Sequence, residues 1–191
     1  YTEREEFSIF KKFFLDHGRC KEMKKKEYFA EQGIVTTHAA YVEKGMFRYV
    51  CTDENGCEHI VGYAFAGEYV GDYPQCIKKE KAIVSIQATT DSLIYYASAQ
   101  EITNFFSTDK STQELEKILA EELFVQTYKR LLDIYCKTPT ELYVDLVRRY
   151  PDFLNYITLR EIASFLRVTP ETISHIPVSY THLRAHETKA N

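Results

Sequence analysis

The spacing of apolar residues changes along the chain, and each change marks a new kind of element. Residues 3–17 carry phenylalanines at helical intervals, which predicts an amphipathic helix that Gly18 ends. From about residue 20 to 98 the period falls to two, and aromatic and β-branched residues become frequent. Turn residues divide this stretch at 32–33, 53–56 and 66–68. We therefore predict a sandwich or barrel of short strands after a leading helix.

The two strands that flank Asn55-Gly56 are predicted to form a β-hairpin, because this pair favours a type I′ turn in which both central residues have positive φ. Such a turn would place Cys51 opposite Ile60 and not opposite Cys57. The five cysteines of the chain show no Cys-x-x-Cys spacing and no histidines at zinc spacing. We therefore expect reduced thiols, no disulfide bond in the hairpin and no metal site.

Helical periodicity returns from about Thr112 to Cys136, where the apolar residues are too many for one face of a helix. A helix packed on a single sheet needs only one apolar stripe, so the second face predicts a partner helix and a homodimer. The residues expected at the dimer contact are Leu115, Ile118, Leu119, Val125 and Leu132. The alternative is a helix buried in a larger monomeric core. A further helix is predicted from Thr140 to about Arg149.

Two short helices joined by a tight turn are predicted near the C-terminus. Thr158 can cap the first helix, and Glu161 three residues later completes a capping box. Thr169 can cap the second helix, with Pro170 at its first position. This pattern is typical of a DNA-binding helix-turn-helix, and the alternative is a helical hairpin packed on a core. The candidate DNA contacts are Thr158, Arg160, Thr169, Glu171, Thr172 and His175.

Composition and charge narrow the function classes. The chain is 45% hydrophobic and 27% charged, which is ordinary for a globular protein. No apolar run approaches the roughly 18 residues of a membrane span, and the first residues do not resemble a signal peptide, so we expect a cytoplasmic protein with no membrane partner. The net charge of −4 argues against strong phosphate binding by this chain. Because no nucleophile–base pair or Gly-rich phosphate loop stands out, we expect no enzyme activity.

The order of these parts resembles the Crp/Fnr superfamily of bacterial transcription regulators over about residues 7–176. The resemblance is carried by residues 41–48, 67–72 and 157–176, in that order. It implies an α+β fold of a β-roll sensor (a double-stranded β-helix or jelly roll), a dimerisation helix and a winged-type helix-turn-helix without its wing. The expected boundaries are 1–108, 109–137 and 138–176. The implied partners are a second copy, palindromic promoter DNA, a small-molecule effector and, as a candidate, RNA polymerase.

The same resemblance bears on the ligand. Nucleotide-binding members of the superfamily hold the ribose and cyclic phosphate with a Gly-Glu pair and, further on, an Arg-Ser pair. Here the first pair is Gly71-Asp72, and the second falls on Ala82 and Ile83. A buried cyclic phosphate would then lack a guanidinium, and Lys81 offers only a point charge. We therefore expect no cyclic AMP or other cofactor, an unknown effector or none, and Gly71, Asp72, Lys81 and Ile83 as the residues of the ligand site.

Residues 177–191 do not fit the superfamily, because Pro177 interrupts the second helix of the helix-turn-helix. Their sequence is similar to a translated sequencing-library adapter, so we expect a non-native tail and poor DNA binding by this chain.

Two other functions stay open. A cupin-type β-barrel metalloenzyme would hold its metal through strand histidines, for which His38 and His59 are the candidates. A sensor or dimerisation module that does not bind DNA is the second.

Overall fold

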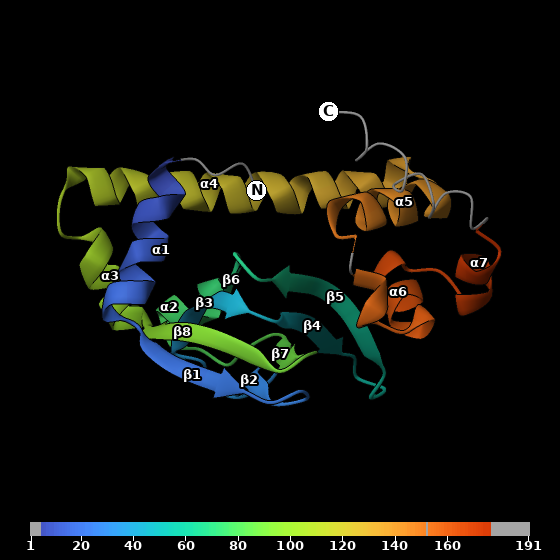
Figure 1. Ribbon diagram of the computed structural model, residues 1–191, viewed down its shortest axis with the longest axis horizontal. Helices are drawn as coiled ribbons and strands as arrows, with labels where there is room; N and C mark the ends of the chain where they lie inside the picture. Colours follow the sequence, from blue (N-terminus) through green and yellow to red (C-terminus); the bar gives the residue numbers. More distant parts are fainter. Residues whose placement is uncertain (1–4, 152, 177–191) are drawn as a thin grey trace. The chain divides into compact units, whose positions relative to one another are not determined.

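The chain folds into two compact units, residues 1–123 and 124–191, in a computed structural model that describes residues 5–151 and 153–176 (Figure 1). We call them the N-terminal and the C-terminal unit and describe each by itself. In the described part of the chain, no helix has the length and apolar character needed to cross a membrane. The expected tail at residues 177–191 lies outside the described residues.

In the described part of the chain, eight strands and four helices follow one another from Glu5 to Cys136. They are α1 (Glu5–His17), β1 (Arg19–Met23), β2 (Tyr28–Ala30), β3 (His38–Lys44), β4 (Met46–Thr52), β5 (Glu58–Phe65), β6 (Tyr69–Val70), α2 (Tyr73–Lys78), β7 (Ser85–Ala88), β8 (Ser92–Ser98), α3 (Ala99–Phe106) and α4 (Lys110–Cys136). The boundary between the units falls inside α4. After α4 come α5 (Pro139–Arg149), the 3₁₀ turn η1 (Phe153–Asn155), α6 (Leu159–Leu166) and α7 (Pro170–Ser174).

The strands form two antiparallel four-stranded sheets that pack as a sandwich, with strand orders β1-β8-β3-β6 and β2-β7-β4-β5 (Figure 1). Both sheets contribute to one apolar core, in which Val42, Phe47, Ile86 and Ile94 are fully buried. This sandwich, the long helix and the C-terminal helices confirm the predicted α+β class.

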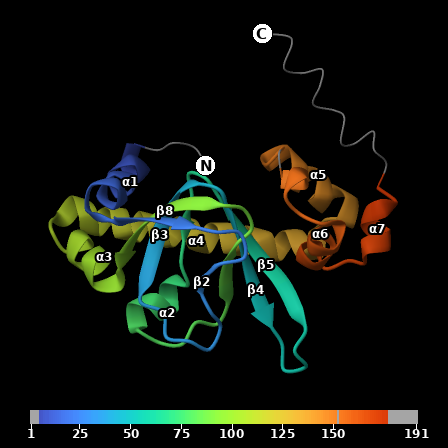
Figure 2. The ribbon, with the colours of Figure 1, turned by 60° about the horizontal axis from the view of Figure 1, so that its bottom comes forward.

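A second core lies on the opposite face of the first sheet. Side chains alternate along β3, so that Val42 faces the other sheet while Tyr41 faces outward toward α1. Helix α1 lies beside β3 and β8 (Figure 2). The predicted phenylalanine stripe of α1 covers this outward face with Phe10, Phe13 and Phe14. Ring stacking and apolar burial therefore hold α1, α3 and the start of α4 against the sheet.

The β4–β5 hairpin differs from its prediction. Only Gly56 has a positive φ, +79°, so the turn is not type I′. The backbone N–H of Gly56 donates to the Asp53 carbonyl at 3.0 Å, and the Asp53 carboxylate accepts the N–H of Asn55 at 2.9 Å. Because these bonds close a longer loop, Cys51 lies opposite His59 and not opposite Ile60. The prediction for this register is wrong by one residue.

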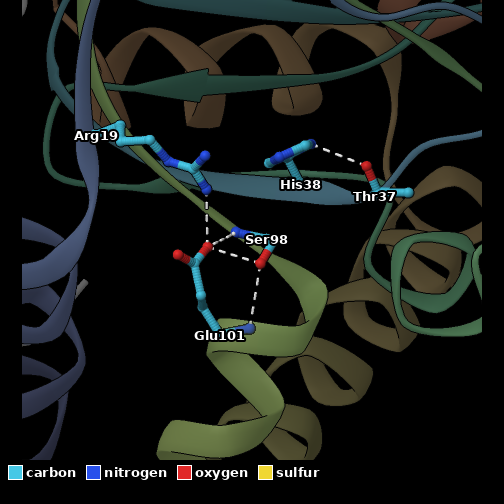
Figure 3. A network of polar contacts seen from close by, with 5 residues as sticks. All are labelled: Arg19, Thr37, His38, Ser98 and Glu101. Carbon is cyan, nitrogen blue, oxygen red and sulfur yellow. Dashed lines mark hydrogen bonds and ion pairs between the residues drawn. The ribbon is translucent and has the colours of Figure 1, made fainter.

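A polar network fixes the junction of β8 and α3 to the edge of the first sheet (Figure 3). The Glu101 carboxylate accepts from the Ser98 hydroxyl at 2.6 Å, the Ser98 N–H at 2.7 Å and the Arg19 guanidinium at 2.9 Å. These donors hold the pKa of Glu101 below its ordinary value. Nearby, His38 Nδ1 lies 2.9 Å from the Thr37 hydroxyl, and burial lowers the pKa of its imidazole. This network caps α3 and anchors β1.

Candidate ligand and nucleic-acid sites

The predicted ligand residues lie at the start of α2 and in the loop before β7. The Asp72 side chain is only 6% exposed, and its carboxylate accepts the backbone N–H of Ile83 at 2.7 Å. It makes no capping hydrogen bond to α2, although it occupies the N-cap position. The structure therefore brings Asp72 and Ile83 together, and the carboxylate holds the loop to the helix.

Gly71 has a packing role beside its predicted ligand role. A Cβ atom at this position would lie 3.0 Å from the Cβ of Ala39, which is tighter than ordinary contact. The Gly71 N–H donates to the Tyr49 hydroxyl at 3.4 Å. The close approach of β3 therefore favours a residue without a side chain here.

Ala82, at the position expected for the phosphate-binding arginine, is buried, and its backbone is hydrogen-bonded to the loop of residues 33 and 34. Ala82 is 3% exposed; its N–H donates to the Ile34 carbonyl at 2.8 Å, and its carbonyl accepts from Gly33 at 2.8 Å. Lys81 and Ile83 on either side are exposed. Lys81 forms no ion pair with any described residue, Asp72 included. The structure thus does not bring a cation to the Asp72 carboxylate.

Two residues of α2 that sequence reasoning missed border this region. The Cys76 thiol is fully buried, and burial together with the Asp72 charge raises its pKa to about 11, so the thiol stays protonated and unreactive near neutral pH. The Tyr73 hydroxyl donates to the Glu116 carboxylate of α4 at 3.4 Å, and burial raises the pKa of Tyr73 to about 12. Because the partner of Tyr73 lies 43 residues away in the sequence, no local pattern signals its role.

The predicted dimer residues of α4 divide into two groups. Leu115 is 4% exposed and packs in the core formed by α1 and α3, and Leu119 packs against the same cluster. These two residues therefore face the interior of their own unit, and their part in a dimer contact stays a prediction. Ile118 is half-buried, whereas Val125 and Leu132 are 40% and 42% exposed.

An apolar face remains uncovered on the part of α4 that belongs to the C-terminal unit. Val125 and Leu132 are separated by one heptad, and aromatic and leucine side chains flank them on the same side of the helix. Phe124 is 68% exposed and Tyr135 is 81% exposed. We call this face the α4 seam; its residues are Phe124, Val125, Tyr128, Leu131, Leu132 and Tyr135.

The predicted helix-turn-helix elements are present with their predicted starts. Glu161 N–H donates to the Thr158 hydroxyl at 3.2 Å, and the Thr158 N–H donates back to the Glu161 carboxylate at 2.9 Å. The Thr169 hydroxyl accepts the N–H of Thr172 at 3.3 Å and caps α7. Between the helices, Arg167 adopts the left-handed conformation with φ +58° and makes the turn tight. The buried residues shared by the pair are Ile162, Ala163, Leu166 and Ile173.

All six candidate DNA contacts lie on the surface of the C-terminal unit, but they are not equivalent. The hydroxyls of Thr158 and Thr169 cap the two helices, whereas Arg160 and Glu171 are exposed to solvent. Backbone and Thr169 hydrogen bonds lower the pKa of Glu171, which keeps its carboxylate ionised. His175 lies at the C-cap, because α7 ends at Ser174, and not inside the helix as we expected.

Two contacts join the last turns of α4 to the other helices of the C-terminal unit. The Lys137 ammonium lies 2.8 Å from the Asp145 carboxylate of α5 and 3.0 Å from the Asp133 carboxylate of α4, and these hydrogen bonds raise the pKa of Lys137 to about 12. The Arg130 guanidinium stacks 4.0 Å from the ring centre of Phe165 in α6. The α4 seam and the helix-turn-helix therefore belong to one packed body. Thr138 caps α5, which begins at Pro139 rather than at the predicted Thr140.

The metalloenzyme alternative lacks a ligand cluster in the described part of the chain. His38 lies on β3 and His59 on β5, in different sheets, and the described residues contain no group of three or more potential metal ligands. His59 Nε2 instead lies 3.0 Å from the Asp53 carboxylate of its own hairpin.

The bond between Asp72 and Ile83 generates a prediction about the loop. Replacing Asp72 by Ala removes a charge-assisted hydrogen bond worth about 1–3 kcal/mol and frees residues 79–83, which carry two lysines. We expect faster cleavage by trypsin after Lys79 and Lys81, measured by mass spectrometry of timed digests. Glu80→Ala in the same loop should digest like the unchanged protein; equal rates for all three proteins would contradict the tie.

Comparisons with known proteins show what the N-terminal unit and the fold of the chain are similar to. Residues 20–109 match the sequence profile of the cyclic nucleotide-binding domain. No curated protein sequence matches the chain. FixK2 from Bradyrhizobium japonicum has a similar structure, with a TM-score of 0.70 at 17% identity over 88% of this chain and 86% of that one.

Two further solved structures extend the likeness. A transcriptional regulator of the Crp/Fnr family from Eubacterium rectale gives a TM-score of 0.68 at 17% identity over 88% of this chain and 81% of that one. The c-di-GMP responsive regulator CLP from Xanthomonas campestris gives 0.61 at 18% identity, over 88% and 89% of the two chains. Residues 20–109 therefore match the cyclic nucleotide-binding domain, within a chain that has the fold of the Crp/Fnr regulators over most of its length.

Proposed function

We propose that this protein is a DNA-binding transcription regulator that acts in the cytoplasm as a homodimer on palindromic promoter DNA. The observation that carries the proposal is that the α4 seam and the helix-turn-helix share one compact unit. A contact between two copies along the seam would therefore fix two reading helices relative to each other, as recognition of a two-fold symmetric site requires.

The exposure of the seam supports a second copy as its partner. Soluble monomers rarely leave a contiguous row of large apolar side chains in water. Val125 and Leu132 recur at the heptad interval, with Tyr128 between them at the position that completes a coiled-coil seam. Two parallel α4 helices would bury these side chains against one another. The parallel direction follows because both helix-turn-helix units must reach the same side of a duplex.

The surface chemistry of α6 and α7 supports a role in reading DNA. The ionised Glu171 carboxylate can accept a hydrogen bond from the N4 amino group of a cytosine, and His175 can donate to a guanine. Thr172 is a further candidate for a base edge. Arg160, Thr158 and Thr169 are candidates for contacts to phosphates. RNA polymerase is a further candidate partner of such a regulator.

The ligand region supports a regulator that does not use cyclic AMP in the usual way. The buried Ala82 takes the place of a guanidinium, and the nearby Asp72 carboxylate would repel a phosphate. Gly71, Asp72, Lys81 and Ile83 therefore form a site for a different small effector, or a site that no longer binds one. Because Tyr73 of α2 is hydrogen-bonded to Glu116 of α4, a movement of α2 would be transmitted to α4.

The seam generates the first test. Each chain has a mass of 22.3 kDa, so light scattering during gel filtration should give about twice that value. Leu132→Asp places a charge in the seam and should give a monomer, because an unpaired buried carboxylate costs several kcal/mol. Ala120→Glu, at an exposed position of α4 that is neither an a nor a d position of the heptad set by Val125, Tyr128 and Leu132, should stay dimeric. A monomer for the unchanged chain, or equal behaviour of the two variants, would contradict the homodimer.

Selection from random duplex DNA at low salt tests whether the helix-turn-helix recognises a DNA sequence. We expect enrichment of inverted repeats whose half-sites lie about one helical turn apart. Glu171→Ala should relax the preference for one C·G pair in each half-site, at a cost of about 1–3 kcal/mol in discrimination. Low salt is needed because we expect weak DNA binding by this chain, which carries a net charge of −4 and in which Pro177 interrupts the second helix of the helix-turn-helix. Enriched sequences without two-fold symmetry would speak against the proposal.

Calorimetric titration tests the prediction for the ligand region. Cyclic AMP should give no saturable heat and no rise in the unfolding temperature, because ligand binding stabilises a folded protein by mass action. A stoichiometric, micromolar interaction with cyclic AMP would show that the buried Ala82 does not exclude the nucleotide.

A further inference from the structure

A pocket lies in the N-terminal unit, apart from α2 and its loop. It has a volume of about 430 Å³ and is formed on the sheet β2-β7-β4-β5. Ser85 and Val50 pair across β7 and β4, and their neighbours Ile86 and Tyr49 face the core between the sheets. Because side chains alternate along strands, Ser85 and Val50 lie on the outer face. We call this the outer-sheet pocket.

The walls of the outer-sheet pocket are fixed by Gln32. Its side-chain amide donates to the Thr52 carbonyl at 3.0 Å and accepts the Thr52 N–H at 2.7 Å, while its backbone N–H donates to the Ser85 hydroxyl at 3.0 Å. These three bonds join the end of β2 to β4 and β7. A pocket that is held open by its own hydrogen bonds loses little conformational entropy when a ligand enters. Its volume also falls in the range of small-molecule sites.

The charges that line the pocket are of one sign. Glu31 and Glu58 both line it, and no lysine, arginine or histidine does. Within the described residues neither carboxylate forms an ion pair or a side-chain hydrogen bond. Two like charges at one pocket repel an anion and each other, and a cation between them relieves this repulsion. The pocket therefore favours a positively charged ligand.

The other lining groups favour an organic cation over a metal ion. No group of three or more potential metal ligands exists in the described part of the chain, so a metal ion would lack its coordination shell. Tyr28, in contrast, lines the pocket with a ring that is 41% exposed and stacks on no other described ring. Aromatic faces attract ammonium groups. The hydroxyls of Thr52 and Ser85 add partners for a ligand hydroxyl.

We propose that the outer-sheet pocket binds a small organic ammonium compound that carries a hydroxyl group. The ammonium lies against Tyr28 between Glu31 and Glu58, and the hydroxyl reaches Thr52 or Ser85. The proposal does not depend on dimer formation or on DNA binding, because every lining residue belongs to the N-terminal unit.

Calorimetric titration of the whole chain with choline tests the proposal. Its neutral isostere 3,3-dimethylbutan-1-ol, in which carbon replaces nitrogen, serves as the matched ligand. We expect saturable binding of one choline per chain, weakened by added salt because the attraction is electrostatic. The isostere should give no saturable heat. Absence of choline binding, or equal binding of the isostere, would overturn the proposal.

Substitutions locate the site. Glu31→Gln and Glu58→Gln should each weaken choline binding by about threefold or more, and the double variant should abolish it. Glu54→Gln, an exposed acid of the neighbouring hairpin loop that does not line the pocket, is the matched control and should bind like the unchanged chain. Circular dichroism confirms that each variant is folded. A loss in the control equal to that in Glu58→Gln would show that choline senses only the net charge.

Discussion

The apolar face of α4 between Phe124 and Tyr135 is the constraint on which the proposed assembly depends. Burial of apolar surface contributes roughly 25 cal/mol per Å², so leaving this row in water forfeits a large stabilisation that a second helix would supply. The same segment of α4 is tied to α5 by Lys137 and to α6 by Arg130. Whatever covers the seam therefore also sets the position of the helix-turn-helix.

In the N-terminal unit, one sheet is apolar on both faces, so both faces must be covered. The inner face packs against the second sheet, and the outer face is covered by the phenylalanines of α1 together with α3 and the start of α4. Leu115 belongs to this covering layer, so its side chain packs within its own unit. The first turns of α4 thus cover the N-terminal unit, and its later turns carry the α4 seam.

Local chemistry could be predicted from the sequence, and distant contacts could not. The caps at Thr158 and Thr169 depend on residues three positions away, so the pattern alone located both helix starts. The packing of Leu115 depends on α1, about a hundred residues earlier in the chain, and on α3, which directly precedes α4. The periodicity of α4 itself does not contain this information. Sequence alone likewise gave no sign of the outer-sheet pocket, whose walls come from four strands.

In the ligand region too, some features could be predicted from the sequence and others could not. The resemblance to the Crp/Fnr regulators indicated that Ala82 and Ile83 replace the phosphate-binding pair, and the buried Ala82 is consistent with that interpretation. The bond from Ile83 to Asp72 could not be foreseen, because the loop geometry that creates it depends on the backbone bonds of residues 33 and 34.

Cross-linking at the seam tests the central claim most directly. In a parallel pair of helices, the two copies of Val125 face each other at a distance that a disulfide can span. Val125→Cys, introduced into a chain whose exposed cysteines are changed to serine, should form a covalent dimer on mild oxidation. Ala120→Cys in the same background should stay monomeric on a non-reducing gel. The exposed cysteines are Cys20, Cys57 and Cys136. Equal cross-linking at both positions, or at neither, would contradict a homodimer built on the α4 seam.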